Sequence, residues 1–341
     1  MIDMHNKTVV VTGANSGVGF VTAKRLAEAG AEIVMVCRDS GRGETARARI
    51  AKSATGPAPQ LFIADLSSQE EIRDVARDIH FAHDRVDVLL NNAGSVFNKG
   101  ERSIDGIEKT FATNHLAPFL LTNLLQDQLL AAPAARVVTV ASEIYSSKLD
   151  FENLQGERSY NFFKAYQQSK LCNVLFAFEL ARRLDDTNVT SNVVSPGPSK
   201  TGFGANMTGP ARTFTRIMKA TPRFGTPETG ARTLVYATTD PELEGVTGRF
   251  YYKEKELATK PITHDTEIAA HLWHISDELC GLGKGSRDHA PAGPDVSEPT
   301  RARKCRSTRW GDRRPTALVS RRAEDDLDVG LVMVVFLSSS G

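Results

Sequence analysis

The chain alternates short apolar runs with helix-length segments, and this alternation restricts its possible folds more than any other feature. The runs "TVVVTG", "AEIVMVC", "QLFIAD" and "RVDVLLNN" each precede a segment of helical length, over 17–29, 43–52, 68–81 and as far as Ala131. Further strands are expected in "ARVVTVAS", "NVTSNVVSPG" and "GRFYYK", with helices over 160–184 and 227–237. Strands and helices in alternation form parallel sheets covered on both faces. We therefore predict an α/β fold with a single doubly wound, Rossmann-type parallel sheet of seven strands.

The composition changes near residue 283, where hydrophobic periodicity disappears. The segment "RDHAPAGPDVSEPTRARKCRSTRWGDRRPT" mixes Arg, Pro, Gly and Asp without an apolar face, and the final "GLVMVVFLSSSG" has too short an apolar core to span a bilayer. We expect one domain over 1–282 and a disordered tail over 283–341. A non-native reading frame or a late extension would fit the change equally well.

Charge and cysteine content exclude several function classes. With 42 Lys and Arg against 41 Asp and Glu, the net charge is +1, so we expect no nucleic-acid partner. The start, "MIDMHNK", contains no apolar segment, which predicts a cytoplasmic protein without a membrane anchor. The four cysteines are far apart, so reduced thiols and no metal site are expected; they are Cys37, Cys172, Cys280 and Cys305.

A glycine-rich segment, "TGANSGVG", directly follows the first predicted strand and opens a helix. In that context Gly13 allows a tight turn, Gly17 lets the backbone approach a pyrophosphate, and Gly19 allows close helix-to-strand packing. The segment predicts dinucleotide binding, although its spacing is G-x-x-x-G-x-G rather than G-x-G-x-x-G. A purely structural glycine turn is the alternative.

The end of the second strand, "VMVCRDS", bears on the choice of cofactor. Dinucleotide folds often place an acidic residue there for the ribose hydroxyls, whereas an Arg accommodates a 2'-phosphate. Cys37 takes the acidic position and Arg38 follows it, so we predict NADP(H), with NAD(H) as the alternative. Asp39 could neutralise Arg38, which would weaken this preference.

Tyr166 and Lys170, in "AYQQSKL", are four residues apart on a predicted helix and therefore share one face. A cation beside a phenol favours the phenolate and lets the tyrosine exchange a proton near neutral pH. Taken alone, the pair is more typical of a helix whose Tyr packs and whose Lys is solvated.

The ordered motifs resemble the short-chain dehydrogenase/reductase family, and within it the retinol dehydrogenase-like branch that includes protochlorophyllide reductase relatives. The resemblance covers about residues 7–279 and rests on "TGANSGVG", "CRDSGRGE", "ADLSS", "NNAG", "TNHLAPFLLT", "VASEIYS", "NLQGERSY", "AYQQSKLCNVLF" and "SPGPSKT". It implies reversible oxidoreduction of a hydrophobic aldehyde, ketone or alcohol, in a protein that is a homo-oligomer in some members and a monomer in others.

The resemblance also implies roles for individual residues. Tyr166 would be the acid/base, and Lys170 would lower its pKa while holding the nicotinamide ribose. Ser142 would bind the substrate oxygen, and Asn114 would hold a water that links Lys170 to solvent. Because hydride transfer to a carbonyl builds negative charge on oxygen, hydroxyl donors at that point stabilise the reaction.

The implied cofactor contacts lie at the carboxyl ends of the strands. They are Ser16, Gly17 and Val18 at the phosphates, Asp65 and Leu66 at the adenine, Asn92, Ala93 and Gly94 after the fourth strand, and Pro196, Gly197 and Thr201 at the nicotinamide carboxamide. Ser199 stands where many members have a branched apolar residue.

An apolar set could line the substrate pocket, although aromatic and Met side chains are more often part of a core. Its members are Ile144, Tyr145, Phe162, Phe163, Phe203, Met207, Phe214, Ile217 and Met218. A non-catalytic dinucleotide sensor on the same fold is the main alternative function, and the Tyr/Lys pair argues against it. An extended-type sugar epimerase or reductase is disfavoured by the glycine spacing.

Overall fold

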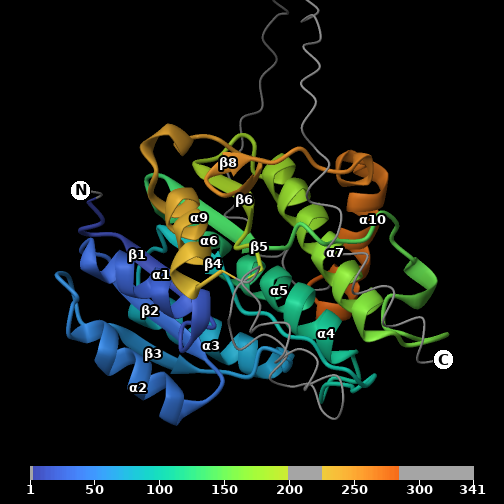
Figure 1. Ribbon diagram of the computed structural model, residues 1–341, viewed down its shortest axis with the longest axis horizontal. Coiled ribbons are helices and arrows are strands. Elements are labelled where there is room, and N and C mark those ends of the chain that lie inside the picture. Colours follow the sequence, from blue (N-terminus) through green and yellow to red (C-terminus); the bar gives the residue numbers. More distant parts are fainter. Residues whose placement is uncertain (1–2, 199–224, 284–341) are drawn as a thin grey trace, which may run out of the picture. The chain divides into compact units, whose positions relative to one another are not determined.

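The computed structural model describes residues 3–198 and 225–283, which are built around one sheet (Figure 1). Its strands are β1 (Thr8–Thr12), β2 (Glu32–Cys37), β3 (Gln60–Ile63), β4 (Val88–Asn91), β5 (Ala135–Val140), β6 (Val189–Ser195), β7 (Phe250–Tyr252) and β8 (Lys255–Glu256). The strand order is β3-β2-β1-β4-β5-β6-β7-β8. The predicted seven parallel strands are confirmed as β1–β7.

The sheet has an eighth strand that the sequence did not predict. Lys253 and Glu254 have φ values of 51° and 61°, and this tight turn folds the chain back on itself. The two residues of β8 consequently pair with β7 in the antiparallel direction. This added strand becomes the edge of the sheet next to β7 and leaves the doubly wound architecture unchanged.

The helices cover both faces of the sheet. They are α1 (Gly17–Glu28), α2 (Ser40–Ala51), α3 (Gln69–Ala82), α4 (Lys109–Phe111), α5 (Ala117–Leu124), α6 (Gln126–Ala131), α7 (Phe162–Arg183), α9 (Pro227–Thr239) and α10 (Thr266–Cys280). Short turns of other helix types are η1 (Ala112–Leu116), η2 (Phe151–Asn153), η3 (Pro241–Leu243) and η4 (Pro261–His264). The predicted helical stretch as far as Ala131 consists of α4, η1, α5 and α6, in which the π-helical turn η1 interrupts the α-helical geometry.

Successive residues of a strand pack alternately into two separate hydrophobic cores, one on each face of the sheet. Val9 and Val11 of β1 are buried with residues of α1, α2 and α9, whereas Val10 is buried with residues of α3, α5, α7 and α10. Figure 1 shows α1 beside α9, and α7 beside α10. The alternation matches the two-residue period of a strand and explains why both sides of each central strand are apolar.

The strand order reverses direction at β1. This strand pairs with β2 on one side and with β4 on the other, so the chain winds away from β1 in both directions. The loops that follow β1 and β4 therefore lead to helices on opposite faces of the sheet, α1 and α5. Open α/β sheets bind their ligands at such a point, at the carboxyl edge. The glycine-rich segment lies at this point.

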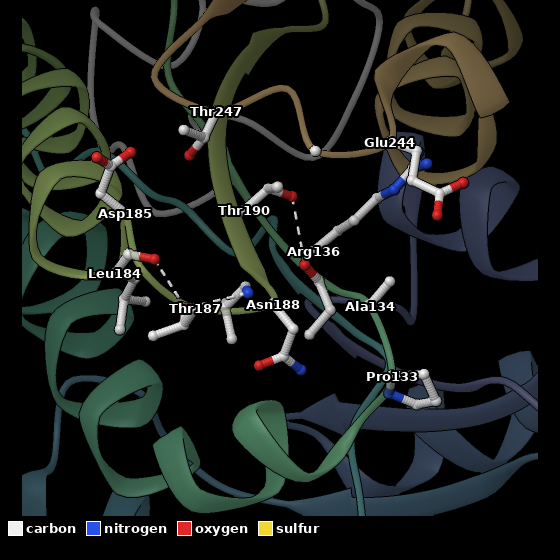
Figure 2. Close-up of a pocket in the computed structure, with 13 residues that line it drawn as sticks. Pro133, Ala134, Arg136, Leu184, Asp185, Thr187, Asn188, Thr190, Glu244 and Thr247 are labelled. Carbon is white, nitrogen blue, oxygen red and sulfur yellow. Dashed lines mark hydrogen bonds between the residues drawn. The ribbon is translucent and has the colours of Figure 1, made fainter.

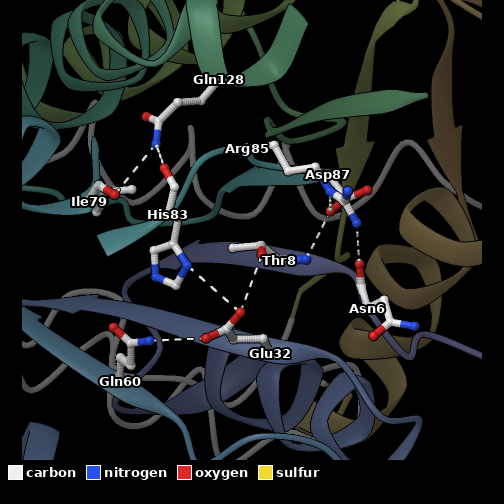
Figure 3. Close-up of polar contacts among 9 residues, drawn as sticks. All are labelled: Asn6, Thr8, Glu32, Gln60, Ile79, His83, Arg85, Asp87 and Gln128. Atoms are coloured by element: carbon white, nitrogen blue, oxygen red, sulfur yellow. Dashed lines mark hydrogen bonds and ion pairs between the residues drawn. The ribbon is translucent and has the colours of Figure 1, made fainter. Parts of the chain in front are cut away.

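A buried carboxylate ties the opposite, amino edge together (Figure 3). Asp87 is fully buried, and its oxygens accept hydrogen bonds from Lys7 Nζ at 2.9 Å and from the backbone N–H of Thr8 at 3.0 Å. Arg85 Nε lies 3.4 Å from the same carboxylate. Nearby, Glu32 accepts from Thr8 Oγ1 at 3.4 Å. Asp87 thus joins the start of β1 to the start of β4.

We expect a chain that stops at Leu282 to fold and to keep its affinity for cofactor. The predicted tail lies outside the described residues, except for Gly283, and its composition lacks the apolar periodicity of a packed element. Soluble yield and calorimetric NADPH binding test this expectation. A chain that stops at Asp265 is the control, because loss of α10 would uncover Phe119, which packs on Trp273 with ring centres 4.9 Å apart. Loss of NADPH binding in the longer truncated chain would contradict the prediction.

Candidate active site

The glycine-rich turn connects β1 to α1 and requires glycine at three places. Gly13 and Gly17 have φ values of +68° and +59°, in the left-handed region that other residues rarely adopt. A Cβ on Gly19 would overlap the side-chain amide of Asn92 and lie 2.6 Å from the carbonyl oxygen of Gly13. Ser16 makes no side-chain capping bond to α1, and the first turn of α1 has no acidic residue. The turn therefore suits a phosphate at the helix N-terminus.

Thr12 joins this turn to the loop after β4. Its Oγ1 accepts hydrogen bonds from the backbone N–H groups of Asn92 and Ala93, both at 3.0 Å. The amide of Asn92 donates in return to the carbonyl oxygen of Thr12 at 2.7 Å. The structure thus brings together the predicted residues after β1 and β4. Thr12 was not among the predicted site residues. A polar residue at the end of an otherwise apolar strand is the sequence feature that could have identified it.

Asn114 lies in the π-helical turn η1 and is fully buried. Its amide donates to Ser95 O and to Ser169 Oγ, both at 2.9 Å, and its Oδ1 accepts from the backbone N–H of Ser95 at 2.7 Å. A Cβ on Gly94 would lie 3.4 Å from Asn114 Oδ1 and 3.5 Å from Lys170 Nζ. The predicted Asn114, Gly94 and Lys170 are therefore neighbours, and glycine leaves space between them.

Tyr166 and Lys170 lie on α7, beside the end of β5. A hydrogen bond joins the side chains of Tyr166 and Ser142. Lys170 is 4% exposed, its Nζ lies 5.8 Å from the centre of the Tyr166 ring, and it donates to Val140 O at 3.0 Å. The structure brings together all four residues that the resemblance assigned to catalysis.

The burial of Tyr166 governs its electrostatics. Burial raises the pKa of Tyr166 to about 12; the hydrogen bond with Ser142 acts in the opposite direction, and the charge of Glu143 raises the pKa further. Burial also lowers the pKa of Lys170 to about 8. Within the protein itself, desolvation of the phenolate dominates, and the lysine ammonium donates to Val140 O. The lowering of the Tyr166 pKa expected from Lys170 together with the positive charge of an oxidised nicotinamide stays a prediction.

Arg38 is exposed directly after β2, and no hydrogen bond or ion pair engages it within the described part of the chain. Asp39 is instead occupied by Arg42: it accepts from the Arg42 backbone N–H at 2.8 Å, and Arg42 Nε lies 3.3 Å from its carboxylate. The alternative that Asp39 neutralises Arg38 is therefore not what the structure shows. Arg38 remains available for a 2'-phosphate.

The residues predicted to contact the adenine and the nicotinamide lie in two further turns. Asp65 Oδ1 accepts from the N–H and hydroxyl of Ser67, both at 2.9 Å, and Leu66 is buried beside it. At the other end Gly197 has a φ of +68°, and its N–H donates to Ser195 Oγ at 3.2 Å. Val18 is buried on α1, Pro196 is half-buried after β6, and Thr201 and Ser199 lie outside the described residues.

The predicted substrate set is only partly described. Tyr145 belongs to the core: it is 4% exposed, packs on Phe250, and its hydroxyl accepts from the Lys260 N–H at 2.9 Å. Its assignment to the pocket is therefore wrong. Ile144, Phe162 and Phe163 are half-buried, and Phe203, Met207, Phe214, Ile217 and Met218 lie outside the described residues.

A hollow of about 230 Å³ lies away from these residues, at the amino ends of β5 and β6 (Figure 2). Two of its threonines donate to backbone carbonyls: Thr187 to Leu184 O at 2.8 Å and Thr190 to Ala135 O at 3.3 Å. Arg136 donates to Asp240 O at 2.9 Å. We therefore place the candidate active site at the carboxyl edge, where Ser142, Tyr166 and Lys170 lie together.

Comparisons with known proteins show the family of the chain. Residues 7–210 match the family model described as short chain dehydrogenase. The chain is 40% identical over 294 residues to retinol dehydrogenase 14 of Mus musculus, which covers 82% of this chain and 88% of the relative. It is 34% identical over 284 residues to the polyprenol dehydrogenase of Homo sapiens, with 81% and 86% covered. Within the described residues, no helix has the length and apolar character needed to cross a bilayer.

Solved structures show the same fold. An uncharacterized protein from Mycobacterium Paratuberculosis superposes with a TM-score of 0.66 at 30% identity, over 82% of this chain and 96% of that chain. A short chain dehydrogenase from Escherichia coli CFT073 superposes with a TM-score of 0.59 at 23% identity, over 74% and 98%. The match to the family model, the identity to the curated relatives and the arrangement of Ser142, Tyr166 and Lys170 lead to one conclusion: the chain belongs to the short-chain dehydrogenase/reductase family, in its retinol dehydrogenase-like branch.

Proposed function

We propose that the protein is an NADP(H)-dependent oxidoreductase that interconverts a hydrophobic aldehyde or ketone with the corresponding alcohol, with Tyr166 as the acid/base. The observation that carries this proposal is the hydrogen-bonded pair of Ser142 and Tyr166 next to Lys170, at the edge of the sheet that also holds the glycine-rich turn. A proton donor and a second hydroxyl there match the needs of a carbonyl that gains a hydride.

The residues present fit a dinucleotide. Gly13 and Gly17 give the glycine-rich turn its positive φ angles, and Gly94 leaves space beside Asn114 and Lys170. Arg38 would pair with the 2'-phosphate, and Lys170 would hold the nicotinamide ribose. When bound, the reduced cofactor supplies the hydride. Because Lys170 carries a pKa near 8, it is charged at neutral pH and can favour the phenolate that remains after proton transfer.

The protein's own residues handle the oxygen and the proton. Ser142 and Tyr166 would both donate to the carbonyl oxygen as negative charge develops there, and Tyr166 would then pass its proton to that oxygen. Asn114 is placed beside Lys170 and would help to supply the replacement proton through water. In the alcohol direction each transfer runs in reverse.

The names of the relatives narrow the substrate class. Retinol and polyprenol are long isoprenoid alcohols, and both occur in the names of proteins at least 34% identical to this chain. We propose that the preferred substrate and product are a long, apolar primary alcohol and its aldehyde, and that the reaction takes place in the cytoplasm. Half-buried Ile144, Phe162 and Phe163 supply apolar surface near the site.

A substrate panel tests the proposal. Retinaldehyde, a polyprenal, medium-chain aldehydes, ketones and the matching alcohols are assayed with NADPH, NADH and their oxidised forms. We expect turnover of apolar members with NADPH or NADP⁺. Tight NADPH binding without turnover of any member would instead favour the non-catalytic sensor.

Arg38→Ala is expected to raise the KM for NADPH by about tenfold or more, because a charge-assisted hydrogen bond contributes about 1.5 to 3 kcal/mol. NADH kinetics should stay within about twofold, since NADH lacks the phosphate. Steady-state kinetics with both cofactors measure the effect. Arg42→Ala is the matched control, because that guanidinium is occupied by Asp39. Equal losses with NADPH and NADH would contradict the assignment.

A further inference from the structure

Glu143 joins the ends of three neighbouring strands at the carboxyl edge of the sheet. It follows Ser142 after β5, and its carboxylate accepts a hydrogen bond from Ser195 Oγ at the end of β6. The side chain of Tyr252, at the end of β7, is also hydrogen-bonded to this carboxylate. Because Ser195 and Tyr252 are partners in the register of β6 and β7, one carboxylate holds two adjacent strand ends.

Ser195 extends this link to the turn after β6. It is 1% exposed, and its single hydroxyl proton goes to Glu143, which leaves the oxygen to accept from the Gly197 N–H at 3.2 Å. A Cβ on Gly197 would lie 3.1 Å from the ring of Tyr252. The turn is therefore held by a hydroxyl and packed against a ring, and both of these groups are bonded to Glu143.

Glu143 also acts on the proton donor. Its chain neighbour Ser142 is hydrogen-bonded to Tyr166, and the negative charge of Glu143 opposes ionisation of that phenol. From α7, the facing charged group is Lys170, with Nζ 5.8 Å from the Tyr166 ring centre. From the β7 side, Lys253 lies 4.8 Å from the ring centre of Tyr252. A carboxylate in this setting favours the protonated form of Tyr166.

We infer that Glu143 is a positioning residue for the reaction: through Ser195 it fixes the Pro196–Gly197 turn, and it places a negative charge next to Ser142, the hydrogen-bond partner of Tyr166. The inference rests on the proposed function, because the turn matters only if it contacts a nicotinamide.

Two substitutions separate the two effects. Ser195→Ala breaks the link to Gly197 but keeps the charge of Glu143. It should weaken calorimetric NADPH binding about fivefold, as expected for one neutral hydrogen bond, and leave the titration of Tyr166 unchanged. Glu143→Gln keeps an acceptor for Ser195 and removes the charge. It should leave NADPH binding within about twofold and move the Tyr166 titration down by about one pH unit.

The titration is followed on the Cζ resonance of Tyr166 in protein labelled with carbon-13 tyrosine, assigned by its loss in Tyr166→Phe. The pH midpoint of alcohol oxidation should move in the same direction in Glu143→Gln. Glu256→Gln is the control. Glu256 lies on β8 and pairs with Arg249 at 3.1 Å, so its substitution should change neither the Tyr166 titration nor NADPH binding.

An unchanged titration in Glu143→Gln, or unchanged NADPH binding in Ser195→Ala, would overturn the inference. Neither the resonance nor the calorimetry needs a substrate. Absence of turnover would therefore count against the proposed function alone. The Tyr166 titration and the NADPH calorimetry would still decide the role of Glu143.

Discussion

Tyr166→Phe is expected to lower kcat by about a hundredfold or more while folding and NADPH binding remain as in the wild type. The substitution removes the hydroxyl that is hydrogen-bonded to Ser142 and keeps the ring, whose centre lies 5.8 Å from Lys170 Nζ. Loss of a positioned acid/base costs about this much. Tyr166 is also a predicted cofactor contact, but Phe removes only the hydroxyl and Lys170 keeps the contact with the ribose. Single-turnover reduction of a panel aldehyde with NADPH measures the effect on chemistry.

Tyr145→Phe is the matched control for this experiment. That hydroxyl also has a raised pKa because of burial, yet it accepts from the Lys260 N–H at 2.9 Å and takes no part in the proposed reaction. Its kcat should stay within about twofold of the wild type. Near wild-type turnover by Tyr166→Phe would show that the mechanism is wrong even though the fold is right.

The pH dependence should follow the protonation of Tyr166. Burial raises the pKa of this phenol to about 12, so the proton-donating form predominates at neutral pH. Carbonyl reduction should accordingly be almost independent of pH around neutrality, whereas alcohol oxidation, which needs the phenolate, should accelerate as pH rises. Initial rates in both directions over one buffer series measure this difference.

Asp87→Ala is expected to destabilise the folded chain by about 3 kcal/mol. The substitution leaves the buried N–H of Thr8 without its acceptor (Figure 3). It also removes the partner of Lys7, whose Nζ lies 2.9 Å from the carboxylate. An unsatisfied buried group costs about 1 to 3 kcal/mol, and a hydrogen bond to a charged group about 1.5 to 3 kcal/mol. Urea unfolding at equilibrium measures the change in free energy.

Asp84→Ala is the control for Asp87→Ala, because Asp84 is an exposed carboxylate of the same loop. Its free energy of unfolding should stay within about 0.5 kcal/mol of the wild type. If Asp87→Ala were as stable as Asp84→Ala, the carboxylate would not hold β1 to β4 in the way the hydrogen bonds indicate.

The sheet was predictable because its strands carry a strong local signal. Runs such as "TVVVT" are buried on both faces, and their apolar continuity marks a central parallel strand. Helix α10 was not predicted, although Asp265 caps its start and Gly281, with a φ of +63°, ends it. Strand β8 had no comparable signal, because two residues pair only after a turn with two positive φ values has formed.

The site was predictable where a motif fixes residue types in order, as for Gly13, Asn114, Tyr166 and Lys170. The supporting contacts were not, because each joins segments far apart in the chain: Thr12 with the loop after β4, Ser169 with Asn114, and Glu143 with Ser195. The direction of the Tyr166 pKa shift was also out of reach, since it depends on how deeply the phenol is buried.

Transfer of a labelled hydride tests the proposed reaction most directly. NADPH carrying deuterium at the transferable position of its nicotinamide ring is incubated with retinaldehyde and the other apolar aldehydes of the panel, and the alcohols are analysed by mass spectrometry. We predict that the wild-type protein places deuterium on the carbinol carbon of at least one product, and that Tyr166→Phe does so about a hundredfold more slowly. Full retention of the label in NADPH that is demonstrably bound to the protein, with every aldehyde and ketone tested, would contradict the proposed function.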